Sequence, residues 1–201
     1  MKLSAHEHLK SRDPIVAQIV TGGAPFKISR NADLYTSLIA SIMSQQLSVK
    51  AADTIHGRFL DLFPARDPRP ERVLALSVEQ LRAVGVSRQK AGYIQNVATF
   101  ALQNDITHAA LKRMTDDEII ALLTQIKGVG RWTVEMLLMF PLNRPDVFPA
   151  DDLGIQTAMK KLYNLRATGP ALRKKMTAIA ENWRPHRTLV CKHLWRWKSA
   201  Q

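Results

Sequence analysis

Apolar residues in this chain recur every three or four positions, which is the spacing of one face of an α-helix. The pattern is clearest in three sets: Leu34, Leu38, Ile39 and Ile42; Ile119, Ile120 and Leu123; Leu189, Val190, His193, Leu194 and Trp197. No segment alternates apolar and polar residues as a half-buried strand does. Ser77 with Gln80, and Thr115 with Glu118, match the capping box that begins a helix. The sequence therefore predicts an all-α fold.

Proline and glycine residues separate the helical stretches. We expect helices near 12–20, 32–45, 49–62, 71–84 with a break, 88–103, 115–124, 131–140, 151–163, 169–181 and 186–197. A chain of 201 residues can bury one substantial core or two small lobes. We therefore expect a single folded unit.

The formal net charge of +12 favours a polyanionic partner, nucleic acid before an anionic membrane surface. The segment from Arg173 to Lys198 alone holds eight Lys or Arg and one acidic residue, Glu181. The single cysteine, Cys191, excludes an internal disulfide and a four-cysteine iron–sulfur cluster. The longest apolar run, Met136 to Phe140, is too short to span a bilayer, so we expect an intracellular protein of cytoplasm, nucleoid or nucleus.

Two helical stretches between Leu123 and Phe140 are joined by Gly128-Val129-Gly130. Such a connection is a tight turn, and the N–H groups opening the second helix form an anion site suited to a DNA phosphate. Lys127 and Arg131 flank that turn. Taken alone, a Gly-x-Gly is also typical of an ordinary helix turn.

Asp151 and Asp152 follow Pro149 at the start of a helical pattern. One aspartate can cap the helix while the other complements its dipole, which is a purely structural interpretation. Only one residue is needed as a cap, so the other carboxylate can instead stabilise a developing sugar cation and orient water.

Trp195 lies opposite the apolar stripe of the last helix, among Arg187, Lys192 and Arg196. This placement suits an aromatic ring that stacks on an extruded base near a phosphate backbone, although an exposed or interface tryptophan is the alternative. His193 falls inside the stripe, which favours a structural role.

Several blocks together resemble the helix-hairpin-helix DNA glycosylase superfamily, and most closely its 3-methyladenine DNA glycosylase II branch. Besides the hairpin they are Ser44-Gln45-Gln46-Leu47-Ser48, Val84-Gly85-Val86-Ser87 with Lys90-Ala91, the stretch from Asp146 to Gly154, and Trp183-Arg184-Pro185 leading to His193-Leu194-Trp195. The similarity covers about residues 30 to 197. The similarity does not extend to the β-rich N-terminal domain of some larger members, and Met136 stands where some relatives carry a pocket tyrosine.

The resemblance implies roles for individual residues. It places the catalytic aspartate at Asp152 and leaves Asp151 as the helix cap. Bifunctional members carry a lysine where this chain has Trp132, so the resemblance implies a monofunctional enzyme with water as the nucleophile. Trp132, Trp195 and Met136 would line the base pocket, and Gln46 would be the wedge that fills the hole left by the flipped nucleotide. Adjacent amides at a helix end, such as Gln45 and Gln46, are otherwise usually just solvated.

The same resemblance implies two helical lobes around a DNA-binding cleft, one of about 34–140 with the hairpin near 123–140, the other of about 1–33 plus 145–201. The phosphate would be held by Lys127, Gly128, Gly130 and Arg131. No cofactor would be required. A monovalent cation, Na⁺ or K⁺, would be held at carbonyls of Thr124, Ile126 and Val129.

The predicted enzyme is therefore a monomer that acts on double-stranded DNA containing alkylated purines such as 3-methyladenine and 7-methylguanine. Two alternatives remain open at this point. One is a glycosylase for a deaminated or mispaired base, and the other is a noncatalytic helix-hairpin-helix DNA-binding protein. The carboxylate of Asp152 is the sequence feature that argues against the noncatalytic alternative.

Overall fold

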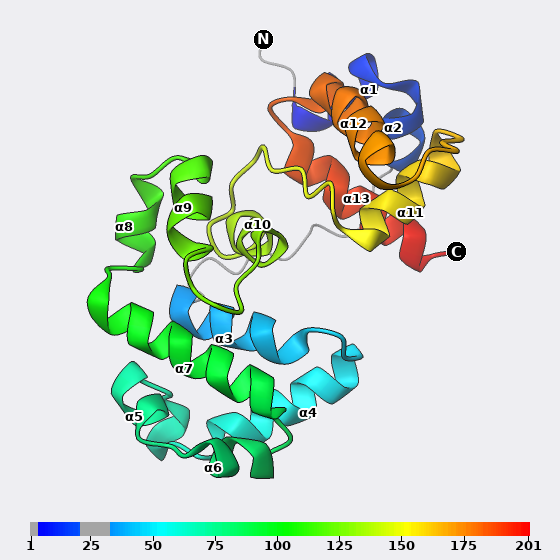
Figure 1. Ribbon diagram of the computed structural model, residues 1–201. Helices are drawn as coiled ribbons and strands as arrows, with labels where there is room; N and C mark the ends of the chain where they lie inside the picture. Colours follow the sequence, from blue (N-terminus) through cyan, green and yellow to red (C-terminus); the bar gives the residue numbers. More distant parts are fainter. Residues whose placement is uncertain (1–3, 21–32) are drawn as a thin grey trace. The chain divides into compact units, whose positions relative to one another are not determined.

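The computed structural model describes residues 4–20 and 33–201. Within them every regular element is helical and no strand occurs, as the spacing of apolar residues predicts (Figure 1). None of the described helices is both long and apolar enough to cross a membrane. The first residue of the helix predicted at 32–45, and residues 1–3 and 21–32 of the segment predicted at 1–33, lie outside the described residues.

The chain divides into two compact units. The central unit is residues 29–137, and the terminal unit combines residues 1–28 with 138–201. The lobe boundaries drawn from the sequence, and the cleft expected between the lobes, stay predictions.

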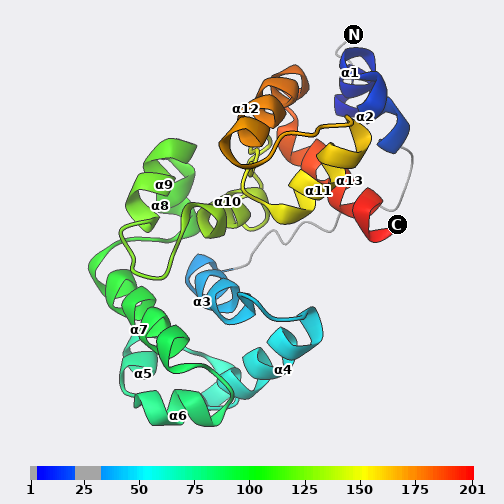
Figure 2. The same ribbon diagram turned by 45° about the vertical axis from the view of Figure 1, so that its right-hand side comes forward.

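The central unit is built around the longest helix, α7. Its elements are α3 (Leu34–Ser44), α4 (Val49–Leu60), η1 (Pro64–Arg66), α5 (Pro70–Leu74), α6 (Val78–Ala83), α7 (Arg88–Gln103), α8 (His108–Lys112), α9 (Asp116–Leu123) and most of α10 (Arg131–Met139). α3, α5 and α6 pack against α7, and α4 packs against α3 (Figure 2). Fully buried side chains fill the space between them, including Leu38, Ile42, Phe59, Leu81, Ile94 and Ile119.

The terminal unit joins the two ends of the chain. Its elements are α1 (Ala5–Arg12), α2 (Pro14–Ile19), α11 (Leu153–Leu162), α12 (Gly169–Ala180), η2 (Glu181–Trp183) and α13 (Arg187–Ser199). α13 packs against both α11 and α2, and Trp183 is completely buried. In this unit α11 and α13 are the elements that carry the predicted catalytic and aromatic residues.

One buried carboxylate, that of Asp13, holds the N-terminal helices on this unit. Its Oδ1 accepts the N–H groups of Ile15 and Val16 at the start of α2. Its Oδ2 accepts the Tyr163 hydroxyl at 2.7 Å and the Trp183 indole N–H at 2.9 Å. Because all four hydrogen bonds end on one carboxylate, α2, α11 and η2 are fixed together.

Local signals explain most of the helix boundaries. The capping boxes at Ser77 and Thr115 are both present and begin α6 and α9. The expected break inside 71–84 is confirmed by the separation of α5 from α6. α1 and α8 were not predicted from the sequence. α8 has only five residues, and α1 has a single buried side chain, Leu9, so neither shows a period, although the capping box of Ser4 and Glu7 could have marked the start of α1.

Candidate active site

Asp152 is the N-cap of α11 and is nearly buried, with 9% of its surface exposed. Its Oδ1 accepts the backbone N–H of Ile155 at 2.8 Å. The carboxylate therefore sits at the positive end of a helix, where its negative charge is stabilised.

The helix cap assigned from the sequence to Asp151 is wrong, because Asp152 occupies that position. Asp151 is exposed and lies 3.4 Å from the guanidinium of Arg173 on α12. The two aspartates therefore differ in environment. The roles of helix cap and free carboxylate are not divided between them, however, as the sequence predicted. One residue both caps the helix and presents the candidate catalytic charge.

Trp195 reaches Asp152 from α13. Its indole N–H donates to Oδ1 of Asp152 at 2.8 Å. The Phe140 ring stacks on Trp195 with centroids 5.9 Å apart and planes 23° from parallel. The ammonium of Lys192 lies 5.4 Å from the centre of that Phe140 ring. The terminal unit therefore joins a fixed carboxylate to a small aromatic cluster.

Gly154 makes this approach possible. A Cβ at this position would lie 2.9 Å from Cδ1 of Trp195 and 3.0 Å from Oδ1 of Asp152. Real Cβ atoms scarcely ever come that close to other heavy atoms, so a larger residue would push the indole away from the carboxylate. Gly154 was part of a block that carries the family resemblance, but sequence analysis gave it no role.

The loop that leads to Asp152 is tied to the start of α13. The Thr188 hydroxyl accepts the N–H of Val147 at 3.0 Å and donates to the carbonyl of Arg144 at 2.7 Å. Arg187 donates to both carboxylate oxygens of Asp146, at 2.7 and 3.1 Å. These bonds fix the loop and, with it, the position of Asp152.

The sequence predicted that Trp195 lies among basic side chains near a phosphate backbone. The structure corrects this prediction for Arg187 and Lys192. Arg187 is only 13% exposed and is held by Asp146, and Lys192 is buried. Burial lowers the pKa of Lys192. Neither residue is a solvated cation of the kind that holds a phosphate. His193 is buried in the same helix, as its place in the apolar stripe predicts.

The hairpin of the central unit has the expected helix–turn–helix form. α9 ends at Leu123, the Val129 N–H donates to the carbonyl of Ile126 at 2.9 Å, and α10 begins at Arg131. Lys127 and Gly130 are exposed.

The two glycines of the hairpin serve different needs. Gly128 has φ +106°, and a Cβ there would lie 2.2 Å from Cγ of Tyr93, so the fold itself requires glycine. A Cβ on Gly130 would meet no atom within 4 Å. Of the two glycines, only Gly130 has open space beside its Cα. Only Gly130 therefore fits the expectation that glycine lets a ligand approach the backbone.

Arg131 and Trp132 stand exposed on the first turn of α10. Arg131 forms an ion pair with buried Glu135 at 3.0 Å, one turn along the helix. Trp132 is 38% exposed, and Met136, one turn further along the same helix, is half-buried. An exposed tryptophan is what a pocket-lining role requires, whereas a core role would bury it.

Gln46, the predicted wedge, lies in the exposed turn that follows α3. Its φ of 59° is in the left-handed region, which is uncommon for a residue other than glycine. The side chain of its neighbour Gln45 points to the hairpin and donates to the carbonyl of Gly128 at 3.4 Å. The central unit therefore brings the wedge turn and the hairpin together.

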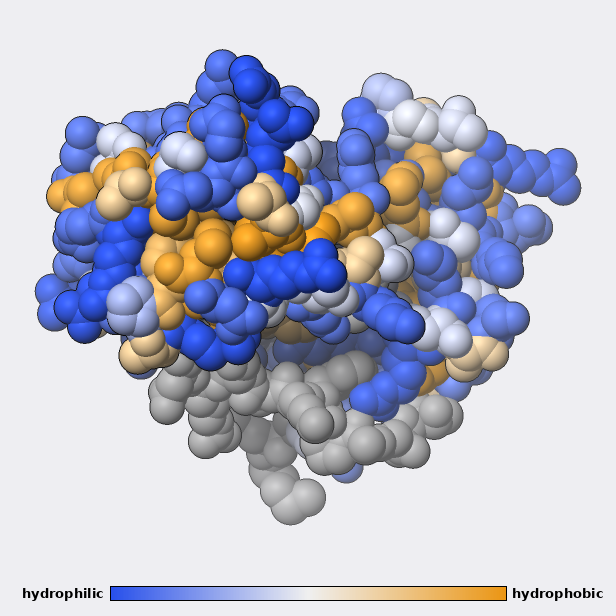
Figure 3. Space-filling view, turned by 90° about the horizontal axis from the view of Figure 1, so that it is seen from below, coloured by the Kyte–Doolittle hydropathy of each residue, from blue (hydrophilic) through white to orange (hydrophobic). Residues whose placement is uncertain are grey.

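Large apolar side chains stay exposed beside several of these residues. Leu47 follows Gln46, and Leu153, which is 76% exposed, follows Asp152. The face shown in Figure 3 likewise has apolar residues at the surface among hydrophilic ones.

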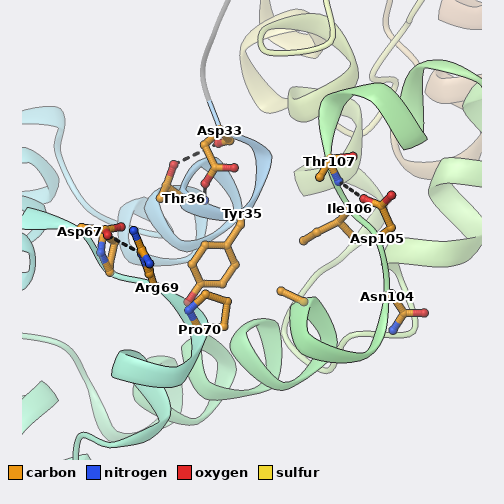
Figure 4. Close-up of a pocket in the computed structure, with 12 residues that line it drawn as sticks. Asp33, Tyr35, Thr36, Asp67, Arg69, Pro70, Asn104, Asp105, Ile106 and Thr107 are labelled. Atoms are coloured by element: carbon orange, nitrogen blue, oxygen red, sulfur yellow. Dashed lines mark hydrogen bonds and ion pairs between the residues drawn. The ribbon is translucent and has the colours of Figure 1, made fainter.

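A separate cavity of about 320 Å³ opens in the central unit (Figure 4). Three aspartates line it, Asp33, Asp67 and Asp105, while its one arginine, Arg69, is bound to Asp67 at 2.6 Å. An acidic lining repels phosphate, so this cavity is not suited to DNA.

The sequence pattern of the HhH-GPD superfamily of base excision DNA repair proteins matches residues 39–185, and the chain belongs to that superfamily. DNA-3-methyladenine glycosylase 1 of Schizosaccharomyces pombe is 37% identical over 185 residues, which cover 90% of this chain and 79% of that protein. A putative DNA-3-methyladenine glycosylase of Bacillus subtilis is 32% identical over 169 residues, covering 81% of this chain and 58% of the relative.

Solved structures agree with these matches. The Schizosaccharomyces pombe 3-methyladenine DNA glycosylase in complex with abasic DNA superposes with a TM-score of 0.85 at 34% identity, covering 97% of this chain and 96% of that one. A DNA-3-methyladenine glycosidase from Bacillus halodurans gives 0.84 at 31% identity, covering 98% and 90%. The resemblance seen in the sequence is thereby confirmed, and so is the helical fold.

Proposed function

We propose that this protein is a DNA glycosylase that flips alkylated purines out of the double helix and hydrolyses their N-glycosidic bond, leaving an abasic site. The names of its relatives support the substrate class, since they are 3-methyladenine DNA glycosylases that align over most of the chain. The observation that carries the proposal is the carboxylate of Asp152, held nearly buried by a helix N-terminus and by the Trp195 indole.

In this mechanism Asp152 stabilises the positive charge that develops on the deoxyribose as the glycosidic bond breaks. It also orients the water that attacks C1′. A cationic alkylated purine is already a good leaving group, so little general-acid help is needed. Trp195 has two tasks, to fix the carboxylate and to offer an electron-rich ring to a cationic base.

Trp132 and Met136 are proposed to contact the extruded base, and Gln46 to fill the space it leaves. Trp132 replaces the lysine that forms a Schiff base in bifunctional members of the superfamily, so the proposed enzyme is monofunctional. The backbone at Gly128 and Gly130, with Lys127 and Arg131, is proposed to hold a phosphate.

The carbonyls of Thr124, Ile126 and Val129 are proposed to bind a Na⁺ or K⁺ ion near that phosphate. The donor set fits, because carbonyl oxygens suit hard cations and a carbonyl such as that of Ile126, which accepts one N–H, keeps a second lone pair. The ion would supply positive charge to the phosphate. No other cofactor is proposed.

Single-turnover release of 3-methyladenine and 7-methylguanine from methylated duplex tests the proposal. Wild-type protein is expected to release both, Asp152→Asn almost none, and Asp151→Asn near-normal amounts. The Asp151 variant is a matched control, because it removes the same charge from the neighbouring residue. Asp151 forms only an exposed ion pair, which contributes little to stability. Duplexes with deaminated or mispaired bases form a second panel. Release from the second panel alone would show that the substrates are deaminated or mispaired bases. Binding without any release would contradict the proposal that the protein is an enzyme.

A further inference from the structure

Lys90 connects two elements of the central unit that sequence analysis treated separately. It lies in the first turn of α7, and its ammonium donates to the carbonyl of Met43 at 2.8 Å and to the carbonyl of Gln45 at 2.7 Å. Met43 is in the last turn of α3, and Gln45 is the residue that ends it. The Lys90 side chain therefore closes the end of α3.

The position of Lys90 is unfavourable for a cation in α7 itself. The first turn of a helix is its positive end, and burial lowers the pKa of Lys90 further. The carbonyls at the end of α3 form a negative helix end, which offsets both effects. The ammonium is thus stabilised by α3 rather than by its own helix.

The turn that Lys90 holds has a strained backbone. Gln46 has φ 59°, a conformation that is unfavourable for a residue with a side chain and persists only where the surroundings fix it. Besides Lys90, the turn is held by the Leu47 N–H, which donates to the carbonyl of Ser44 at 3.1 Å. Removing the ammonium would leave this bond and two longer ones, from the Gln45 N–H to the carbonyl of Ile42 and from the Gln45 side chain to the carbonyl of Gly128, each at 3.4 Å.

The same face of α7 holds the hairpin. Tyr93, one turn after Lys90, packs against the bare Cα of Gly128. Asn96, a further turn along, donates to the carbonyl of Lys127 at 3.0 Å. Residues spaced by three lie on one side of a helix, so a single rigid element fixes the wedge turn and the phosphate-binding turn together.

We propose that Lys90 is a positioning residue that sets the Gln45–Leu47 turn at a fixed place relative to the hairpin. Gln46 then enters the duplex at a defined distance from the bound phosphate. The part that concerns DNA rests on the proposed function of Gln46. The part that concerns the turn itself does not.

The first experiment uses the free protein. Lys90→Met keeps the unbranched stem, which lies beside a cavity of about 100 Å³ whose lining includes Met43, Leu47 and Val86. Loss of two charge-assisted hydrogen bonds is expected to speed amide exchange at Leu47 by roughly tenfold. Exchange in the middle of α3 should not change. Lys90→Arg should restore most of the protection, and Lys10→Met, at an exposed position of α1, is the charge control. Unchanged protection at Leu47 in Lys90→Met would overturn the proposal.

The second experiment tests whether Lys90 acts through Gln46. A duplex carrying a stable abasic analogue opposite 2-aminopurine reports contact with the widowed base by fluorescence. Lys90→Met and Gln46→Ala are each expected to weaken the response by about tenfold, and the double variant by no more than either single one, because both remove the same contact. Independent, multiplicative effects would show that Lys90 does not act through Gln46.

Failure of the proposed enzyme gives a different result. If wild-type protein released no methylated purine, the proposed function would fall, while amide exchange at Leu47 would still decide whether Lys90 fixes the turn.

Discussion

The indole N–H of Trp195 donates a hydrogen bond of 2.8 Å to the carboxylate oxygen of Asp152 that also caps α11. A single oxygen therefore receives two N–H groups from two helices, which leaves it little freedom to rotate. In the proposed mechanism the ring that stacks on the base and the carboxylate that carries the catalytic charge are therefore fixed to each other. Substitutions that separate the two contributions of Trp195 test this directly.

Trp195→Phe keeps an aromatic face but removes the donor to Asp152. A hydrogen bond to an ionised group contributes about 1.5–3 kcal/mol, so we expect the single-turnover excision rate to fall about tenfold or more. Affinity for lesion duplex should change little, because the ring remains. Trp195→Ala should in addition weaken binding, most strongly for cationic lesions. Equal excision rates for wild type and Trp195→Phe would show that the hydrogen bond plays no part in catalysis.

Gly154→Ala should disturb the same pair although neither Trp195 nor Asp152 is substituted. The added methyl would overlap both Trp195 and Asp152, and overpacking of this kind costs about 1–3 kcal/mol. We expect a lower melting temperature and, per folded molecule, excision slowed by at least about tenfold. Gly92→Ala in α7 is the control, since a Cβ there meets nothing within 4 Å and should leave excision unchanged. A Gly154→Ala enzyme as active as wild type would show that the pair tolerates displacement.

The helical fold could be predicted from the sequence because helices carry a local signature. Apolar spacing and capping residues act over a few positions, and α6 and α9 begin where their capping boxes predict. Short helices such as α8 cannot be predicted in this way, because five residues are too few to show a period.

The candidate site was harder to predict, because its geometry depends on contacts between distant positions. The sequence could mark Asp151 and Asp152 as a pair at a helix start, but the choice of cap depends on how the loop after Asp146 is anchored to Thr188 and Arg187. The partners of Lys90 lie more than forty residues away in the chain. No local pattern encodes such contacts, so sequence reasoning assigned Lys90 no role.

Trp132 leads to a prediction about strand cleavage. With no lysine at this position, the proposed enzyme cannot form the Schiff base that precedes β-elimination in bifunctional members. Methylated duplex incubated with the protein should therefore keep an intact abasic strand that breaks only after alkali. Borohydride should trap no protein–DNA adduct. Trp132→Lys is an informative companion variant, and efficient trapping by wild-type protein would mean that another amine attacks the sugar.

His193 gives a prediction about pH and stability. Burial, with the nearby charges of Arg196 and His6, lowers its pKa to about 4 from an ordinary 6.5. The unfolded chain therefore binds this proton first as pH falls, so the stability present above about pH 6.5 is progressively lost down to about pH 4. The loss from one such group approaches about 1.4 kcal/mol per pH unit. Denaturant unfolding of His193→Gln should show a flatter dependence over this window. The exposed control His108→Gln should follow wild type, and equal slopes for all three proteins would contradict the assignment.

Two substitutions of Gly130 that differ only in charge test the phosphate site of the hairpin. Because a Cβ there points into open space, both Gly130→Asp and Gly130→Asn should fold with melting temperatures close to that of wild type. Phosphate contacts position a protein without reading sequence, so Asp should weaken binding to damaged and undamaged duplex alike. Asn has nearly the same shape without the charge and should bind several times more tightly than Asp. The gap between the two variants should narrow as salt rises, since screening weakens the repulsion. Titration of both variants at two salt concentrations decides the matter, and equal affinities at low salt would show that no phosphate lies at this turn.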